Sequence, residues 1–290
     1  MVPPPRNRRA FYQRFQAALN GVKRFKPVTG ITNLKKPNDN SLQLASPSFR
    51  LPALDQQYLL GDSTRGVRFM LEYAKAEEIL RRWRVCSTIV VFGSARIPRS
   101  SPWYETARSF SHLASEKGGA KELRDGFRHN VIATGGGPGI MEAANRGASE
   151  AGAPSIGFNI TISLEQEPNA FSTPDLTFQF HYFAMRKMHL AMRAAALIVF
   201  PGGFGTFDEL FEILTLRQTG KMPDIPIVLV DREYWTRVIN FEELLEHGMI
   251  APPELKLFSF AEDAEDIWST ASASGLKVHL KWHRDSLPQL

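Results

Sequence analysis

The stretch ALIVFPGGFGTFDEL, residues 196–210, predicts a strand that turns into a helix at a ligand site. Its first five residues form an uninterrupted apolar run, which is typical of a strand buried on both faces. Glycines then lead into a helix expected over 206–218. Glycines at such a junction let the backbone approach a ligand and aim N–H groups at an anion. We therefore expect a phosphate to be held by Gly202, Gly203, Phe204, Gly205 and Thr206.

The same strand–glycine pattern occurs twice earlier in the chain. STIVVFGSA (87–95) ends in Gly93-Ser94, and HNVIATGGG (129–137) ends in three glycines. Further strands are expected at 154–160, 176–183, 196–203 and 225–231, and helices at 61–82, 102–117, 139–151, 184–195, 206–218 and 233–247. Alternating strands and helices indicate a doubly wound α/β fold, a Rossmann-like parallel sheet flanked by helices on both faces. Ligands bind beyond the carboxyl ends of such strands, so the three glycine-bearing ends should converge on one crevice.

The second glycine loop, TGGGPGIMEA (134–143), narrows the class of ligand. It lacks the G-x-G-x-x-G spacing of dinucleotide sites and the Gly-Lys-Ser/Thr of kinases and ATPases. Phosphate or sugar binding by Gly136 and Gly137 and close packing of a tight turn both stay open. Ser94, at the first strand end, is expected either to bind phosphate or ribose or to cap a helix.

Charged residues beside the expected phosphate site suggest chemistry. Asp208 and Glu209 are expected in the first turn of their helix, where acids stabilise the positive helix end. That explanation covers Asp208, but a second acid beside a phosphate would oppose binding unless it has a role. In FAMRKMHLAMR (183–193), Arg186 and Lys187 are expected to point toward the same crevice, where an arginine would orient a carboxylate or bind phosphate. Solvated helix charges are the alternative.

Composition limits the class of protein. Apolar residues make up 43% of the 290 residues and charged residues 22%, as in ordinary globular proteins. Residues 1–50 carry a net charge of +9 and the other 240 residues −4, so the basic character belongs to a proline-containing tail. No apolar run approaches the roughly 20 residues of a membrane span. The only cysteine, Cys86, cannot form an internal disulfide and fits a reducing compartment, so we predict a cytoplasmic protein.

These observations predict four parts: a largely irregular basic tail (1–50), a leader helix region (51–82), one catalytic domain (83–275) and a C-terminal tail (276–290). The tail lacks the apolar core of a secretory signal, although an organelle transit segment is an alternative. We expect no metal, because His181 and His189 have no companion ligands. Nucleic acid is an unlikely partner, since the body of the chain has no broad basic surface.

The motifs GGGPGIMEA, MRK and PGGFGTFDE resemble those of the LOG family, Rossmann-like nucleotide-binding proteins long labelled "lysine decarboxylase-like". The family hallmark PGGxGTxxE is matched from Pro201 to Glu209, and the Arg-Lys pair by Arg186-Lys187. The resemblance covers about residues 85–270. Two positions depart from the family pattern: Leu190 stands where RKxxM has methionine, and Ala195 where an aspartate is common. The glycine loop GGGPGIMEA is the shorter form seen in larger bacterial members, in place of the longer GGGSxGLMG loop of plant-type members.

The resemblance implies a phosphoribohydrolase, which cleaves the N-glycosidic bond of a nucleoside 5′-monophosphate such as AMP or a cytokinin riboside monophosphate. It implies catalytic roles for Arg186 and Glu209 and a homodimer or higher homo-oligomer. Glu142 and Glu165 are further candidate substrate contacts, together with Lys187 and Asp208. No cofactor is expected, because a pyridoxal phosphate enzyme needs a Schiff-base lysine and none lies in a persuasive setting. The alternatives are a non-catalytic nucleotide or molybdenum-cofactor carrier, and a regulatory protein that binds partners through its tail.

Overall fold

The computed structural model describes residues 39–161 and 167–277 of the chain. The chain separates into two compact units, residues 1–71 and 72–290, and the division falls inside helix α4 (Arg65–Arg82). Each unit is therefore considered by itself. The four-part division predicted from the sequence stays a prediction.

The described part of the first unit consists of short helical turns. Helices α2 (Ser41–Ala45) and α3 (Gln56–Leu59) alternate with 3₁₀ turns at Pro47–Phe49, Pro52–Leu54 and Asp62–Thr64. Helix α4 begins at Arg65, four residues later than predicted, because a separate turn precedes it. The buried hydroxyl of Thr64 fixes this turn, since it lies 2.8–2.9 Å from the carbonyl oxygens of Tyr58, Leu59 and Gly61.

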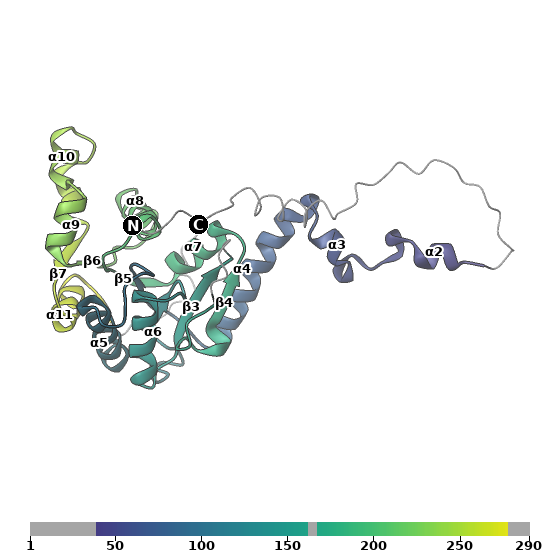
Figure 1. Ribbon diagram of the computed structural model, residues 1–290, viewed down its shortest axis with the longest axis horizontal. Coiled ribbons are helices and arrows are strands. Elements are labelled where there is room, and N and C mark those ends of the chain that lie inside the picture. The colour runs from purple at the N-terminus through teal and green to yellow at the C-terminus, as the bar shows by residue number, and fades with distance from the viewer. Residues whose placement is uncertain (1–38, 162–166, 278–290) are drawn as a thin grey trace. The chain divides into compact units, whose positions relative to one another are not determined.

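The second unit is built on one parallel sheet of seven strands in the order β4-β3-β2-β1-β5-β6-β7 (Figure 1). The strands are β1 (Thr88–Phe92), β2 (Val131–Thr134), β3 (Ser155–Ile160), β4 (Thr177–Phe180), β5 (Ala194–Val199), β6 (Ile227–Val230) and β7 (Ser259–Ala261). Every neighbouring pair is parallel; Val90 of β1, for example, pairs with Ala133 on one side and Leu197 on the other. The predicted doubly wound α/β fold is confirmed.

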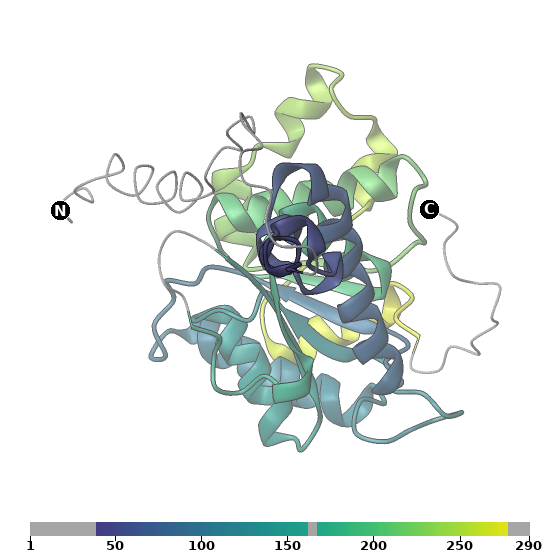
Figure 2. The ribbon, with the colours of Figure 1, turned by 90° about the vertical axis from the view of Figure 1, so that its right-hand side faces the viewer.

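Helices cover both faces of this sheet because its strands are apolar on both. In β1, Ile89 and Val91 pack into one core with α5 (Pro102–Lys117), α6 (Ile140–Glu150) and α11 (Ala264–Ala273). Val90 and Phe92 face the other core, with α4, α7 (Phe183–Met192), α8 (Phe204–Gln218), α9 (Arg232–Val238) and α10 (Phe241–Glu246). Figure 2 shows the sheet between the teal helices α5 and α6 and the green helices α7 and α8.

The carboxyl-terminal part of the sheet domain differs from the sequence prediction in its helices and strands. The single helix expected over 233–247 is wrong: α9 ends at Val238, and Asn240 begins α10 by accepting a hydrogen bond from the Glu243 N–H. Asparagine is a strong helix cap, and this signal lies within the predicted helix. Strand β7 and helix α11 were not predicted, because three residues are too few to show a strand pattern.

The order of the strands places the ligand site. The chain runs from β1 through β2 and β3 to β4 in one direction and from β5 through β6 to β7 in the other, so the order reverses between β1 and β5. At such a switch point the connections leave the two strands toward opposite faces and open a crevice at their carboxyl ends. The segments that start there are 93–101 after β1 and 200–203 after β5.

Candidate active site

A cleft of about 700 Å³ opens at this switch point. It is lined by residues from all three glycine-bearing strand ends, as the sequence predicts: Phe92, Gly93, Ser94, Ala95, Arg96, Gly135, Met141, Phe183, Arg186, Gly203, Phe204, Gly205, Thr206, Phe207 and Glu209. The predicted site residues Ser94, Arg186, Gly203, Phe204, Gly205, Thr206 and Glu209 are thus brought together. Their roles toward a substrate stay predictions.

Ser94 ties the three loops to one another. Its N–H donates to the Pro201 carbonyl after β5 (3.0 Å), and its own carbonyl accepts from the Ile140 N–H at the start of α6 (3.2 Å). Gly139 makes the second contact possible: it has a φ of +68°, and a Cβ there would lie 2.4 Å from the Ser94 carbonyl oxygen. The Ser94 hydroxyl accepts from the Arg96 N–H (3.1 Å), so it shapes its own loop and does not cap a helix.

The glycines after β5 differ in what surrounds them. A Cβ on Gly202 would lie 2.1 Å from the Thr206 hydroxyl oxygen, so glycine is needed there for packing. The Gly202 carbonyl is held by the Tyr234 hydroxyl (2.7 Å). Gly203 and Gly205 line the cleft with no atom within 4 Å of a Cβ position. The backbone at these two residues is therefore open to a ligand.

Arg186 and Glu209 form an ion pair at the edge of the cleft. Arg186 projects from α7 and Glu209 from α8, and each is less than a tenth exposed. The Arg186 guanidinium also stacks on Phe183, 5.2 Å from the ring centroid. The Arg186 Nε is buried without a protein partner. A positioned carboxylate therefore faces the cleft, held by a cation whose geometry is fixed by its neighbours.

Burial raises the pKa of Glu209 to about 7. The positive charge of Arg186 acts in the opposite direction, and Asp208 adds to the increase. A carboxyl group with a pKa near neutrality exchanges protons readily at physiological pH, which is the property of a general acid or base. Perturbed groups of this kind in a cleft are typical of catalytic sites.

Helix α8 begins earlier than predicted, at Phe204. Asp208 and Glu209 are therefore in its second turn, and the expectation that they stabilise the first turn is wrong. The glycines lie inside or directly before the helix, because the helix starts as soon as the turn at Gly203 is complete. Gly203 has no side chain to cap the helix, so the first N–H groups of α8 remain available at the cleft.

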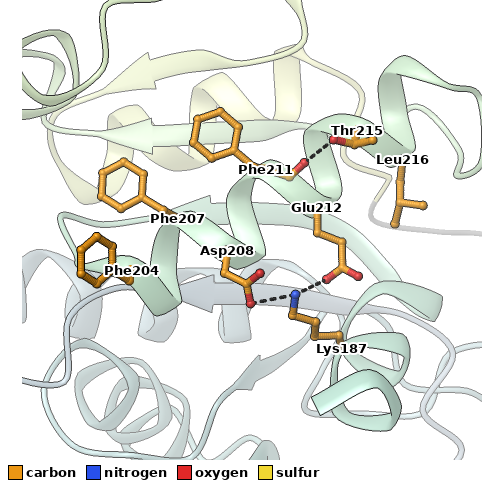
Figure 3. A pocket seen from close by; sticks show the side chains of 8 residues that line it. All are labelled: Lys187, Phe204, Phe207, Asp208, Phe211, Glu212, Thr215 and Leu216. Atoms are coloured by element: carbon orange, nitrogen blue, oxygen red, sulfur yellow. Dashed lines mark hydrogen bonds and ion pairs between the residues drawn. The ribbon is translucent and has the colours of Figure 1, made fainter.

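Arg186 and Lys187 do not share a crevice, contrary to the sequence prediction. Consecutive helix residues point about 100° apart. Lys187 lies in a second groove along α8, where its ammonium contacts Asp208 (2.7 Å) and Glu212 (3.4 Å) (Figure 3). Phe204, Phe207 and Phe211 form the apolar side of this groove, and Phe204 is 95% exposed. Lys187 and Asp208 thus lie outside the cleft that Glu209 faces.

The remaining predicted residues also lie apart from the cleft. Gly136 and Gly137 are buried, and their carbonyls accept hydrogen bonds from the backbone and side-chain nitrogens of Asn169 (2.8 and 3.1 Å). The Glu142 carboxylate accepts hydrogen bonds from Arg99 (2.7 Å) and from the Tyr104 hydroxyl (2.8 Å). Gly202 is not among the residues that line the cleft and lies close to the side chain of Thr206. Glu165 lies outside the described residues.

Arg96, Met141 and Phe183 are among the cleft residues that sequence reasoning did not name. Each follows the carboxyl end of a strand by only a few residues, which is the signal that would have found them. Among the described residues, no three His, Cys, Asp or Glu side chains are gathered as a metal ion would require. No helix within the described ranges is long and apolar enough to cross a membrane.

The region of the chain that contains Arg186 and Glu209 is similar to known proteins. Residues 141–271 match the family model "Possible lysine decarboxylase". Two cytokinin riboside 5′-monophosphate phosphoribohydrolases of Arabidopsis thaliana are similar, one 33% identical over 84 residues and one 26% identical over 142 residues. These alignments cover 28% and 48% of this chain and 39% and 61% of the relatives. The chain thus spans less than two thirds of either relative.

Two solved structures are similar to this chain at low sequence identity. The molybdenum cofactor binding protein of Rippkaea orientalis is 17% identical with a TM-score of 0.44, covering 66% of this chain and 96% of that protein. The molybdenum cofactor carrier protein of Chlamydomonas reinhardtii is 19% identical with a TM-score of 0.40, covering 66% and 97%. The family match, the phosphoribohydrolase relatives and the intact PGGFGTFDE motif together support the resemblance of this chain to the LOG family.

Proposed function

We propose that the cleft hydrolyses the N-glycosidic bond of a nucleoside 5′-monophosphate to give the free base and ribose 5-phosphate. The observation that carries the proposal is the Arg186–Glu209 pair, a buried carboxylate held at the edge of a cleft whose rim is open glycine backbone. A site that only stored a nucleotide would gain nothing from a buried carboxylate beside its phosphate, because the two negative charges repel.

The amino end of α8 is the proposed phosphate anchor. Gly203, Gly205 and Thr206 line the cleft there, and the first N–H groups of a helix have no partners within it. The positive end of the helix dipole adds to this attraction. Binding of the phosphate, remote from the reacting bond, then supplies energy for placing the ribose.

Glu209 is the proposed catalytic group. Cleavage of an N-glycoside builds positive charge at the ribose C1′, which a nearby carboxylate stabilises. Water supplies the hydroxyl that bonds to C1′ as the bond from C1′ to the base nitrogen breaks. Glu209 accepts the proton of that water, and the proton ends on the departing base. Arg186 holds the carboxylate in position and stabilises its ionised form.

The substrate class follows from the motif resemblance and the relatives. The relatives are named for cytokinin riboside 5′-monophosphates, so AMP and such nucleotides are the first substrates to test. We propose a cytoplasmic location, because the only cysteine, Cys86, cannot form an internal disulfide and fits a reducing compartment.

The test is release of ribose 5-phosphate from a panel of nucleoside monophosphates by wild-type protein, Glu209→Ala and Arg186→Ala. The exposed pair Arg237–Glu233, with its nitrogen and oxygen 3.3 Å apart, gives matched controls, Arg237→Ala and Glu233→Ala. We expect turnover by the wild type and both controls and a loss of more than about a hundredfold in the site variants. Binding of AMP by the wild type without turnover of any substrate would refute the enzyme and favour a nucleotide carrier.

A homodimer is proposed with the second groove as its contact surface. Phe204, Phe207 and Phe211 present an apolar strip along α8, bordered by Lys187, Asp208 and Glu212 (Figure 3). A strip that carries both charge signs can pair with its own copy across a two-fold axis. Light scattering should give twice the chain mass for the wild type and a smaller mass for Phe211→Glu. An equal, monomeric mass for both proteins would exclude this interface.

A further inference from the structure

The positive charges in the lining of the cleft outnumber the negative charges. Two cations and one acid line it: Arg96, Arg186 and Glu209. Arg186 and Glu209 are paired with each other. Lys187, the next cation along α7, is paired with Asp208 and Glu212 in the neighbouring groove. Arg96 is therefore the one cation of the cleft lining whose charge no described carboxylate matches.

The backbone holds Arg96 at the cleft. Its N–H donates to the Ser94 hydroxyl (3.1 Å), which closes a tight turn directly after β1. Ser94 is in turn bonded to Pro201 beside the glycine rim and to Ile140 at the start of α6. The loop that carries Arg96 is thus fixed to the two other strand ends, while its side chain is exposed and free to meet a ligand.

The neighbouring arginine of the same loop behaves differently. Arg99 contacts Glu142 (2.7 Å), which also accepts a hydrogen bond from Tyr104 (2.8 Å). Arg99 therefore fastens the loop to α5 and α6 and has its charge matched. The comparison separates a structural arginine from one that is left for a ligand.

We propose that Arg96 binds the 5′-phosphate of the substrate and makes the cleft select phosphorylated nucleosides over unphosphorylated ones. This inference rests on the proposed function for the identity of the ligand. A guanidinium group forms two parallel hydrogen bonds to a phosphate, which the single N–H groups of a helix end do not. Arg96 is thereby a specificity-determining residue, and Glu209 remains the group that acts on the bond.

Calorimetry with AMP, ribose 5-phosphate and adenosine tests the proposal on wild-type protein, Arg96→Gln, Arg96→Lys and the control Arg237→Gln. Loss of this exposed charged contact to the phosphate should weaken the binding of AMP and ribose 5-phosphate at least about tenfold in Arg96→Gln. Arg96→Lys should recover part of this affinity, and adenosine should bind equally to all four proteins. In turnover of AMP, KM should rise while kcat stays the same, because the phosphate contact is equal in ground and transition states.

The possible outcomes distinguish failure of the Arg96 proposal from failure of the proposed hydrolase. Weaker binding of AMP by Arg96→Gln without turnover in any protein would refute the proposed hydrolase and leave the role of Arg96 standing. Equal affinity of the wild type and Arg96→Gln for AMP would overturn the role of Arg96. So would an equal loss for adenosine, or a wild type that binds neither AMP nor ribose 5-phosphate. Unchanged thermal unfolding of Arg96→Gln excludes a folding defect.

Discussion

Arg186 of α7 and Glu209 of α8 are joined in an ion pair although 23 residues, including the whole of β5, separate them in sequence. Their side chains are only 10% and 7% exposed. The pair therefore links the helices that precede and follow β5, and it places one charge of each sign at the edge of the cleft. Its contribution to stability and its contribution to chemistry can be measured separately.

Removing one member of the pair should destabilise the protein. Arg186→Met or Glu209→Leu leaves an unmatched buried charge, which costs about 3–5 kcal/mol of unfolding free energy. The double variant should lose much less unfolding free energy than the two single variants lose together, because neither buried charge remains. Urea unfolding of the four proteins gives the coupling energy. Strictly additive losses would mean that the two charges do not stabilise each other.

Activity should depend on the ionisation of Glu209. Because burial raises its pKa to about 7, kcat/KM should rise with pH up to about 7 and then level off. Asp208 contributes to the raised pKa and Lys187 opposes it. Asp208→Asn should thus move the rise to lower pH, and Lys187→Met to higher pH. A profile that stays in place in both variants would assign the titration to another group.

Alanine substitutions at Gly202 and Gly205 should have different effects on stability and on AMP binding. In Gly202→Ala the new Cβ meets Thr206, so we expect a loss of about 1–3 kcal/mol of stability. In Gly205→Ala the Cβ meets no atom, and alanine in a helix is more favourable by up to about 1 kcal/mol. Gly205→Ala should therefore fold at least as well as the wild type but bind AMP more weakly. Thermal unfolding and AMP titration of both variants distinguish packing from ligand contact.

Glu77 should control acid stability. Burial tends to raise its pKa, but Arg193 at 2.6 Å and Arg81 at 2.9 Å hold the pKa below the ordinary 4.5. A lowered pKa in the folded state stabilises the protein above about pH 4.5, and this is lost as the pH falls through the folded pKa. Glu77→Gln should thus cost about 3 kcal/mol at pH 7 and less below pH 4.5.

The adjacent residue Glu78 is the control for that experiment. It is 72% exposed and pairs with Arg82, which is 70% exposed. Glu78→Gln should therefore change the unfolding free energy by less than about 1 kcal/mol at either pH. Equal effects of Glu77→Gln and Glu78→Gln would show that burial of the Glu77–Arg193 pair has no part in stability.

Two deletions test where the catalytic unit begins. Removing residues 1–50 should leave turnover unchanged, whereas removing residues 1–82 should prevent folding. Ala76 and Leu80 of α4 are buried in the core, and Glu77 is paired with Arg193. Far-ultraviolet circular dichroism and AMP turnover of the two proteins check this. A folded, active 83–290 fragment would show that α4 is not needed for folding or turnover.

Patterns that repeat were predictable from the sequence, and contacts between distant residues were not. A buried strand such as that at 196–200 can be recognised from its unbroken apolar run, and glycines mark its end. The convergence of such ends follows from the rules of parallel sheets. Helix geometry separates Arg186 from Lys187 by about 100°, but which of the two lines the cleft depends on how α7 packs, and the sequence does not show this. The partners of Glu142 could not be predicted for the same reason: only the fold brings Arg99 and Tyr104 to it.

The contacts of α4 also set an order of events as the chain is made. Glu72 accepts hydrogen bonds from the N–H groups of His181 and Tyr182, 109 and 110 residues further on, and Glu77 pairs with Arg193 at a separation of 116 residues. Contacts between such distant residues form only after the intervening chain has emerged from the ribosome. The first long helix of the described chain is therefore synthesised before β1, whereas its contacts with His181, Tyr182 and Arg193 form only once α7 has been made. A nascent chain that stops before α7 leaves Glu72 and Glu77 without these partners.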